Sequence, residues 1–139
     1  MAEFRTMIIT NKGQALIAKM LAGKGNIQFT KISLSETAYT DAQILELGSI
    51  GGVKQSTAVT KITKTSDAAV QVEGAVTNSD LTKGYYIRTI ALHAKDPDEG
   101  EIVYAACGAS TPGWMPPYNG VSTSGCFLKL VTTVQNASN

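Results

Sequence analysis

The chain has 139 residues, of which 43% are hydrophobic and 17% are charged, and its formal net charge is +1. The balance of 12 basic and 11 acidic residues argues against a nucleic-acid partner, which needs a basic patch. No run approaches the ~18 apolar residues of a membrane span, and the N-terminus lacks the apolar region of a secretory signal. We therefore expect a single domain over residues 1–134, synthesised in a cytoplasm and not inserted in a membrane, with a polar linker-like tail over 135–139.

Apolar residues at three- and four-residue spacing predict an amphipathic helix over residues 12–22. Its apolar stripe would consist of Leu16, Ile17, Met20 and Leu21. Asn11 with Gln14 three residues later approximates a capping box at the helix start, and Gly23 is typical of a helix end. We expect the stripe to pack against a sheet.

The next segments alternate between strand and loop patterns. Ile27–Ser35 predicts a strand whose apolar residues change parity, which indicates a β-bulge or a change of partner. Residues 36–52 predict a loop with one helical turn after Thr40. Residues 53–65 predict a strand with one solvent-exposed face. Apolar and polar residues alternate over 68–77, which predicts the second strand of a hairpin.

The most regular pattern is Gly84–Cys107, which predicts a central hairpin with its turn at Asp96–Gly100. Its first strand is apolar on both parities, as expected where both faces of a sheet are covered. Residues 127–134 predict the last strand. Together these patterns predict an α+β fold, in which an N-terminal helix packs on a mostly antiparallel sheet or sandwich of about six to seven strands.

Residues 108–125 predict a long loop that is rich in Gly, Ser, Pro and Thr. Loops of this length in compact domains are usually functional, and Trp and Tyr often dominate interface energies. The candidate interface residues in this loop are Trp114, Met115, Tyr118 and Asn119. We expect Trp114 and Tyr118 to lie at or beside a subunit contact; the alternative is that Trp114 folds back onto the domain's own core.

The residues that carry chemistry do not form a recognisable active site. His93 is the sole histidine, and its surroundings in the sequence contain no GxSxG-type nucleophile motif. Cys107 and Cys126 are interpreted first as small apolar residues, while a disulfide and, less favoured, a metal pair remain open. We therefore expect no enzyme activity, no catalytic residue, no cofactor and no metal.

Three segments together resemble the N-terminal domain of phage tail-collar fibre proteins. They are Ile9–Lys19 with its TNxG opening, Phe29–Leu34, which is similar to an F-T-K/R-I strand, and Gly84–Tyr104, which is similar to GYxIREIGLFA-x-DPDxGEILYA. Thr89, Ala91 and His93 stand where the family usually has Glu, Gly and Phe. The resemblance spans nearly the whole chain in the same order.

This resemblance implies a structural virion protein of a phage tail tip, fibre or tail-like particle, which anchors the fibre or receptor-binding apparatus to the baseplate. It implies a homo-oligomer, with a trimer favoured, and baseplate or tail proteins as partners. The alternative is a carbohydrate- or receptor-binding module that contacts host surface glycans through Trp114, Tyr118 and Asn119. The family carries no catalytic residues to transfer.

Overall fold

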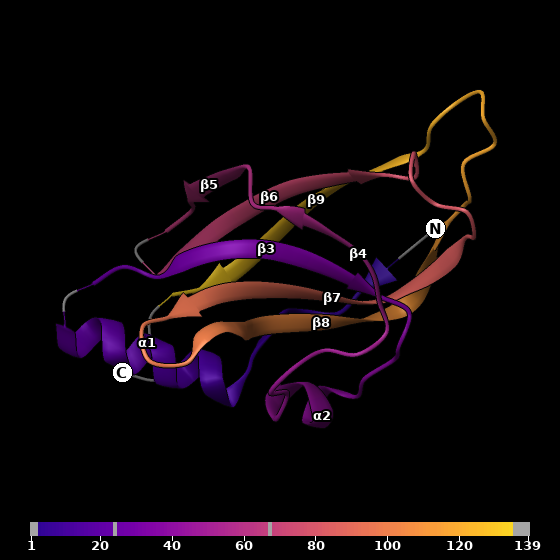
Figure 1. Cartoon of the computed structure of the whole chain (residues 1–139). Helices are drawn as coiled ribbons and strands as arrows, with labels where there is room; N and C mark the ends of the chain where they lie inside the picture. The colour runs from indigo at the N-terminus through magenta and orange to yellow at the C-terminus, as the bar shows by residue number, and fades with distance from the viewer. Residues whose placement is uncertain (1–2, 24, 67, 135–139) are drawn as a thin grey trace.

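The computed structural model describes residues 3–23, 25–66 and 68–134, and in this part of the chain nine strands form two antiparallel sheets (Figure 1). The larger sheet has the order β1-β8-β7-β3-β4, with β2 also paired to β8. Its strands are β1 (Glu3–Phe4), β2 (Ile8–Ile9), β3 (Gln28–Ser35), β4 (Val53–Ala58), β7 (Tyr85–Asp96) and β8 (Gly100–Met115). The smaller sheet has the order β5-β6-β9, with β5 (Lys61–Lys64), β6 (Ala69–Thr77) and β9 (Gly125–Thr133).

The main core lies between the two sheets, which face each other across the molecule (Figure 1). Ile32 and Leu92 enter it from the large sheet, and Val72 and Leu128 enter it from the small one. Side chains of this type stabilise the folded state by roughly 1.5–3 kcal/mol each when fully buried. The α+β class with an N-terminal helix is confirmed, although the strand count exceeds the six to seven expected.

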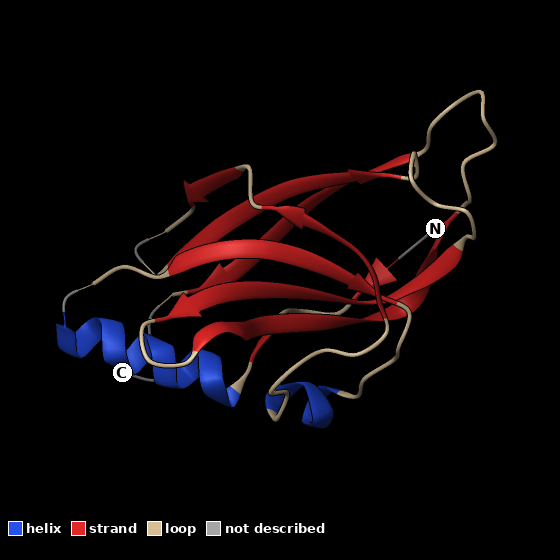
Figure 2. Ribbon diagram, viewed as in Figure 1, coloured by secondary structure: helices blue, strands red, loops and turns tan. Residues whose placement is uncertain are grey.

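Helix α1 (Asn11–Gly23) matches the predicted helix and lies beneath the end of the sandwich where β7 and β9 finish (Figure 2). Leu16 and Ile17 are buried in the main core, but Leu21 is 53% exposed, so the apolar stripe is narrower than expected. The start of the helix also differs. The Thr10 hydroxyl accepts from the Gly13 N–H at 3.0 Å, so the capping oxygen comes from one residue before Asn11.

An ion pair fastens α1 to the turn between β7 and β8. The Lys19 ammonium lies 2.9 Å from both carboxylate oxygens of Asp96, whose side chain is buried. The same carboxylate accepts from the Asp98 N–H at 2.8 Å, as expected for a turn that begins with Asp. These contacts, above all the one to Lys19, hold the pKa of Asp96 below its usual value.

The parity change in the predicted strand of residues 27–35 is a β-bulge, because the register of β3 against β7 shifts between Phe29 and Lys31. The short helix α2 (Asp41–Leu45) confirms the predicted helical turn, and Thr40 with Gln43 forms its capping box.

The single strand expected over residues 53–65 is wrong, because the chain there divides into β4 and β5 and changes sheets. The Thr60 N–H donates to Glu73 O at 2.9 Å in the small sheet, whereas the Val59 N–H still points to Thr30 O in the large one. The predicted hairpin is confirmed by the pairing of β5 with β6. Part of its turn, at Asp67, lies outside the described residues, as does the expected tail over 135–139.

The loop expected over 108–125 is also wrong in its first half, because β8 continues to Met115. Ile87 pairs with Gly113 and Thr89 pairs with Gly108, so one residue of β7 stands opposite four residues of β8. Two of these four residues, Ala109 and Thr111, pair with β1 on the other edge of β8, so a segment rich in turn-forming residues is still a strand. Pro112 is tolerated in this irregular stretch, where the β7 ladder is interrupted.

The large sheet is covered on both faces in its middle, as the pattern of β7 predicted. On the outer face a second apolar cluster is formed by Ile44 of α2 with Ala91, Val103 and Ala106 of the sheet. Leu92, the next residue of β7, faces the main core instead. Alternate residues of β7 are therefore buried by different layers.

Leu16→Asp in α1 is expected to abolish or severely reduce folded protein, because a carboxylate would replace a fully buried leucine. The milder Leu16→Ala should destabilise the fold by about 2–5 kcal/mol through loss of apolar contact and a residual cavity. Leu21→Asp on the same helix is the matched control and should leave the urea midpoint nearly unchanged. Equal midpoints for the Leu16 and Leu21 variants would contradict the packing described for α1.

Candidate functional site

The candidate site lies on the outer face of the large sheet and consists of exposed Tyr86 and Trp114 with half-buried Arg88. We call these three residues the aromatic cluster. Tyr86 and Trp114 are cross-strand partners of β7 and β8, with ring centroids 4.9 Å apart and ring planes inclined at 53°. The Arg88 guanidinium carbon lies 5.2 Å from the centroid of the Tyr86 ring, a cation–π distance. The three side chains thus form one continuous surface.

The interrupted ladder between β7 and β8 places this cluster on the surface. Tyr85 and Ile87 face the main core, so Tyr86 between them points outward. After the irregularity at Arg88 the parity reverses, and Ile90 and Leu92 become the core residues. The Arg88 guanidinium also donates to Glu36 O at 3.1 Å, which fixes its direction.

Trp114 is held in place although it is 54% exposed. A Cβ added to Gly84 would come within 2.6 Å of the Trp114 ring, so the ring lies directly against the Gly84 backbone. With Tyr86 on one side and Gly84 below, the indole presents its remaining surface to solvent in a fixed orientation. Fixed aromatic side chains lose little conformational entropy when a partner covers them.

The other predicted interface residues divide between core and loop. Met115 is only 3% exposed and packs in the main core, so it is withdrawn from the candidate contact surface. Tyr118 is partly exposed in the loop between β8 and β9, and its N–H donates to Leu81 O at 3.1 Å. The Asn119 carboxamide accepts from the Val121 and Ser122 N–H groups, so it organises the loop rather than offering its oxygen outward.

The loop over residues 116–124 projects from the sandwich beyond the end of β8 (Figure 1). Buried Asn78 closes its base: its amide donates to Pro116 O at 2.9 Å, and its side-chain oxygen accepts from the Ser124 N–H at 2.8 Å. Near the tip Val121 is 88% exposed. A loop fixed at its base with an apolar tip is suited to contact another surface.

Sequence reasoning found Trp114 but missed Tyr86 and Arg88. In a strand, one of the adjacent residues Tyr85 and Tyr86 must face outward, but the strand is apolar on both parities. The outward residue could therefore not be identified without the register of β7 against β8.

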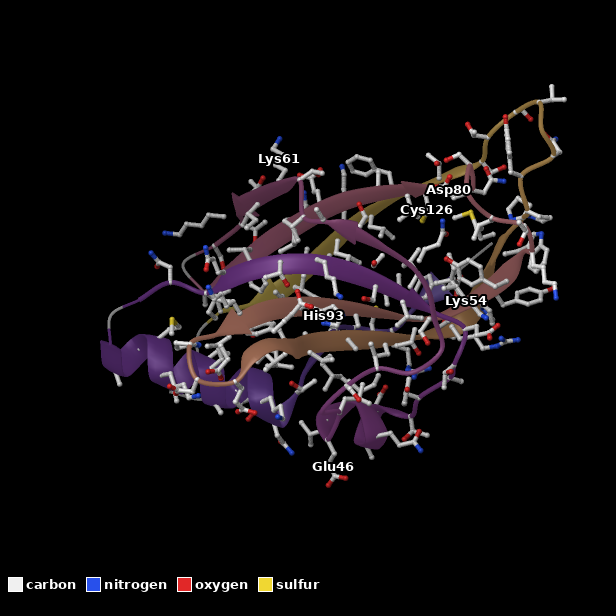
Figure 3. The ribbon with its side chains drawn as sticks, viewed as in Figure 1. Glu46, Lys54, Lys61, Asp80, His93 and Cys126 are labelled. Carbon is white, nitrogen blue, oxygen red and sulfur yellow. The ribbon has the colours of Figure 1, made fainter. Side chains whose placement is uncertain are left out.

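His93 has a partner that the sequence did not reveal. Its Nε2 atom lies 2.8 Å from the Ser33 hydroxyl, and the side chain is near the middle of the large sheet (Figure 3). Burial lowers the pKa of His93, as does the Lys31 ammonium. The ring is thus neutral at neutral pH, and the tautomer of the ring decides whether Nε2 donates to Ser33 or accepts from it.

A serine beside a histidine is half of a nucleophile–base arrangement. Here, however, Ser33 is 2% exposed and His93 is 7% exposed, so the hydroxyl is not presented to a substrate. The neighbouring charges, Lys31 and Glu101, pair with each other at 3.1 Å. We interpret the Ser33–His93 contact as the mutual satisfaction of two buried polar side chains.

The cysteines are both free thiols, with Cys107 buried and Cys126 half-buried at the start of β9 (Figure 3). Burial raises the pKa of the Cys107 thiol to about 11, so it stays protonated and behaves as a small apolar residue. Among the described residues, no group of three or more His, Cys, Asp or Glu side chains is placed to hold a metal ion. Within the same residues no helix is long and apolar enough to cross a membrane.

No family model, curated protein or solved structure matches this chain. Function is therefore inferred from the geometry of the aromatic cluster together with the sequence resemblance.

The melting temperature is expected to fall as the pH is lowered from about 7 to about 5, because unfolding releases a histidine that takes up a proton more readily than it does in the fold. The folded pKa lies below 6.5, so stability is full above the unfolded value and is lost as the pH falls. Asp96 and Glu101 have lowered pKa values and titrate at more acidic pH.

His93→Gln, whose side-chain amide can still form a hydrogen bond with Ser33, should remove most of this pH dependence. The measurement is thermal unfolding followed by circular dichroism across that pH range. A variant with the same slope as the original chain would show that the ring is not buried as a neutral base.

Proposed function

We propose that this chain is a structural protein of a phage tail tip, fibre or tail-like particle, which anchors the fibre or receptor-binding apparatus to the baseplate. It would act in the virion as a homo-oligomer, with a trimer favoured, in contact with baseplate or tail proteins. The observation that carries the proposal is the exposed aromatic cluster of Tyr86, Arg88 and Trp114.

The composition of the cluster supports a protein contact. Trp, Tyr and Arg are the residue types most enriched among the positions that dominate interface energies. Here they are adjacent, partly exposed and oriented by the sheet, so a partner could cover them at a small cost in side-chain entropy. The projecting loop with Tyr118 and Val121 extends the same end of the molecule (Figure 1).

The resemblance to tail-collar fibre proteins supports the particle assignment. The three departures from the family pattern in β7 are Thr89, Ala91 and His93, and all are buried. The Thr89 hydroxyl donates to Thr37 O at 2.8 Å, Ala91 packs in the outer apolar cluster, and His93 contacts Ser33. The three departures thus lie inside the fold and are not part of the aromatic cluster.

A glycan-binding role is the second candidate, and the exposed Trp114 indole favours it because sugar rings stack on such faces. The Tyr86 and Trp114 planes are inclined at 53°, so they do not form a flat platform for two successive sugars. A protein surface, which can follow an inclined pair, fits this geometry better.

Trp114→Ala is expected to weaken the oligomer or its attachment to a neighbouring particle protein by about 2 kcal/mol or more, as for a dominant interface residue. Its effect on the melting temperature should be small, because more than half of the side chain is already in water. Leu21→Ala is the matched control, since Leu21 is exposed to a similar extent on α1. Sedimentation velocity measures assembly, and calorimetry measures the fold.

The attachment role would be contradicted by a Trp114→Ala protein that keeps its oligomeric state, still joins particles and loses only thermal stability. Retention on host cell-wall glycans by a monomer, abolished by the same substitution, would instead support the glycan-binding role.

A further inference from the structure

The small sheet leaves part of the large sheet uncovered beside β9. A groove of about 540 Å³ lies between β9 and the ends of β7 and β8. Its apolar lining includes Phe4, Ile87, Ile90, Met115, Cys126 and Leu128. The small sheet has three strands against six in the large one, so the groove lies where a fourth strand of the small sheet would cover the large sheet.

In the described part of the chain, the edge of β9 that borders this groove pairs with no further strand. The Asn78 N–H donates to Ser124 O at 2.9 Å, and the Val134 N–H donates to Ala68 O at 2.8 Å. The β6–β9 register is unbroken between these two bonds, so even-numbered residues of β9 bond to β6. The N–H and C=O groups of Phe127, Lys129 and Val131 therefore point away from β6, toward the groove side.

One end of this edge is already closed. The Tyr104 hydroxyl donates to Thr133 O at 2.6 Å, so the last residue of β9 has a partner from β8. The open part thus runs from Gly125 to Val131. It is long, and Phe127 and Val131 beside it are exposed, which makes it a template for a further strand.

We propose that this edge binds an extended segment of another protein as a fourth strand of the small sheet. The side chains of that segment facing the groove would be apolar, and one side chain on its opposite face would be a carboxylate beside Lys129. Among the described residues Lys129 has no carboxylate partner, and its ammonium lies 5.6 Å from the Phe127 ring centroid. Charge complementarity therefore selects an acidic, amphipathic strand.

A second copy of β9 fits this position less well. In a symmetric antiparallel pair centred on Lys129, the two ammonium groups would stand opposite each other, and like charges opposite each other destabilise a sheet. The inward side chains of such a strand, Leu128 and Leu130, already belong to the core of their own subunit. Of the aromatic cluster only Trp114 lines the groove, so the two proposed contact surfaces adjoin at Trp114, whereas Tyr86 and Arg88 belong to the attachment contact alone.

The test uses the whole chain and a blocked heptapeptide, Thr-Val-Thr-Val-Glu-Val-Thr, whose valines would face the groove and whose glutamate would lie beside Lys129. We expect binding to quench or shift the fluorescence of Trp114, the single tryptophan, which lines the groove. Amide hydrogen exchange should slow at Phe127, Lys129 and Val131. The neighbouring even-numbered amides, already bonded to β6, are the internal control.

The requirement for a carboxylate beside Lys129 is tested by reversing the charge first on the peptide and then on the protein. A peptide with Lys in place of Glu should bind roughly tenfold more weakly, and Lys129→Glu in the protein should reverse that preference. Val131→Pro is a second variant: its lost N–H belongs to the free edge, so pairing with β6 is kept while the new strand is blocked.

Absence of peptide binding, equal binding of the Glu and Lys peptides, or protection at amides outside the odd-numbered set would each overturn the proposal. If Val131→Pro fails to fold, the Lys129→Glu reversal decides the question alone. Aggregation of Lys129→Ala without any peptide binding would show that Lys129 serves only to keep a bare edge soluble.

Discussion

The interrupted pairing of β7 with β8 is the constraint on which the rest of the structure depends. Alternate side chains of a strand face opposite layers, so a regular β7 would have kept one parity buried along its whole length. The irregularity at Arg88 reverses that parity, so Ile87 and Ile90 both pack in the main core. It also divides the outer face into a half covered by α2 and a half that is open to solvent.

Both proposed contact surfaces follow from this division. Tyr86 and Trp114 are exposed because they precede and follow the irregularity, beyond the reach of α2. The groove beside β9 is lined by Phe4 of β1 and by the last residues of β8 after the irregularity, where the small sheet is only three strands wide. One local irregularity thus provides an aromatic surface on one face and an uncovered strip on the other.

The sequence predicted the features that depend on local pattern. The α1 helix, the turn of α2, the two hairpins and the bulge in β3 each follow from periodicity or turn residues within a few positions. It failed where distant partners override composition. Pro112 and Gly113 indicated a loop, but pairing with β1 and β7 makes the segment a strand, and Ser33 meets His93 only because β3 and β7 are neighbours.

The N-terminal segment depends on a partner that is far away in the chain. The Thr10 hydroxyl donates to Val103 O at 2.6 Å across a separation of 93 residues, and β1, β2 and α1 all contact β8. At a synthesis rate of about 5–20 residues per second, these elements wait roughly 5–20 s on the ribosome for the strand that they cover. Contacts between residues so far apart in the chain give a high contact order, which favours slow folding. The N-terminal elements can take their native positions only after β8 has formed.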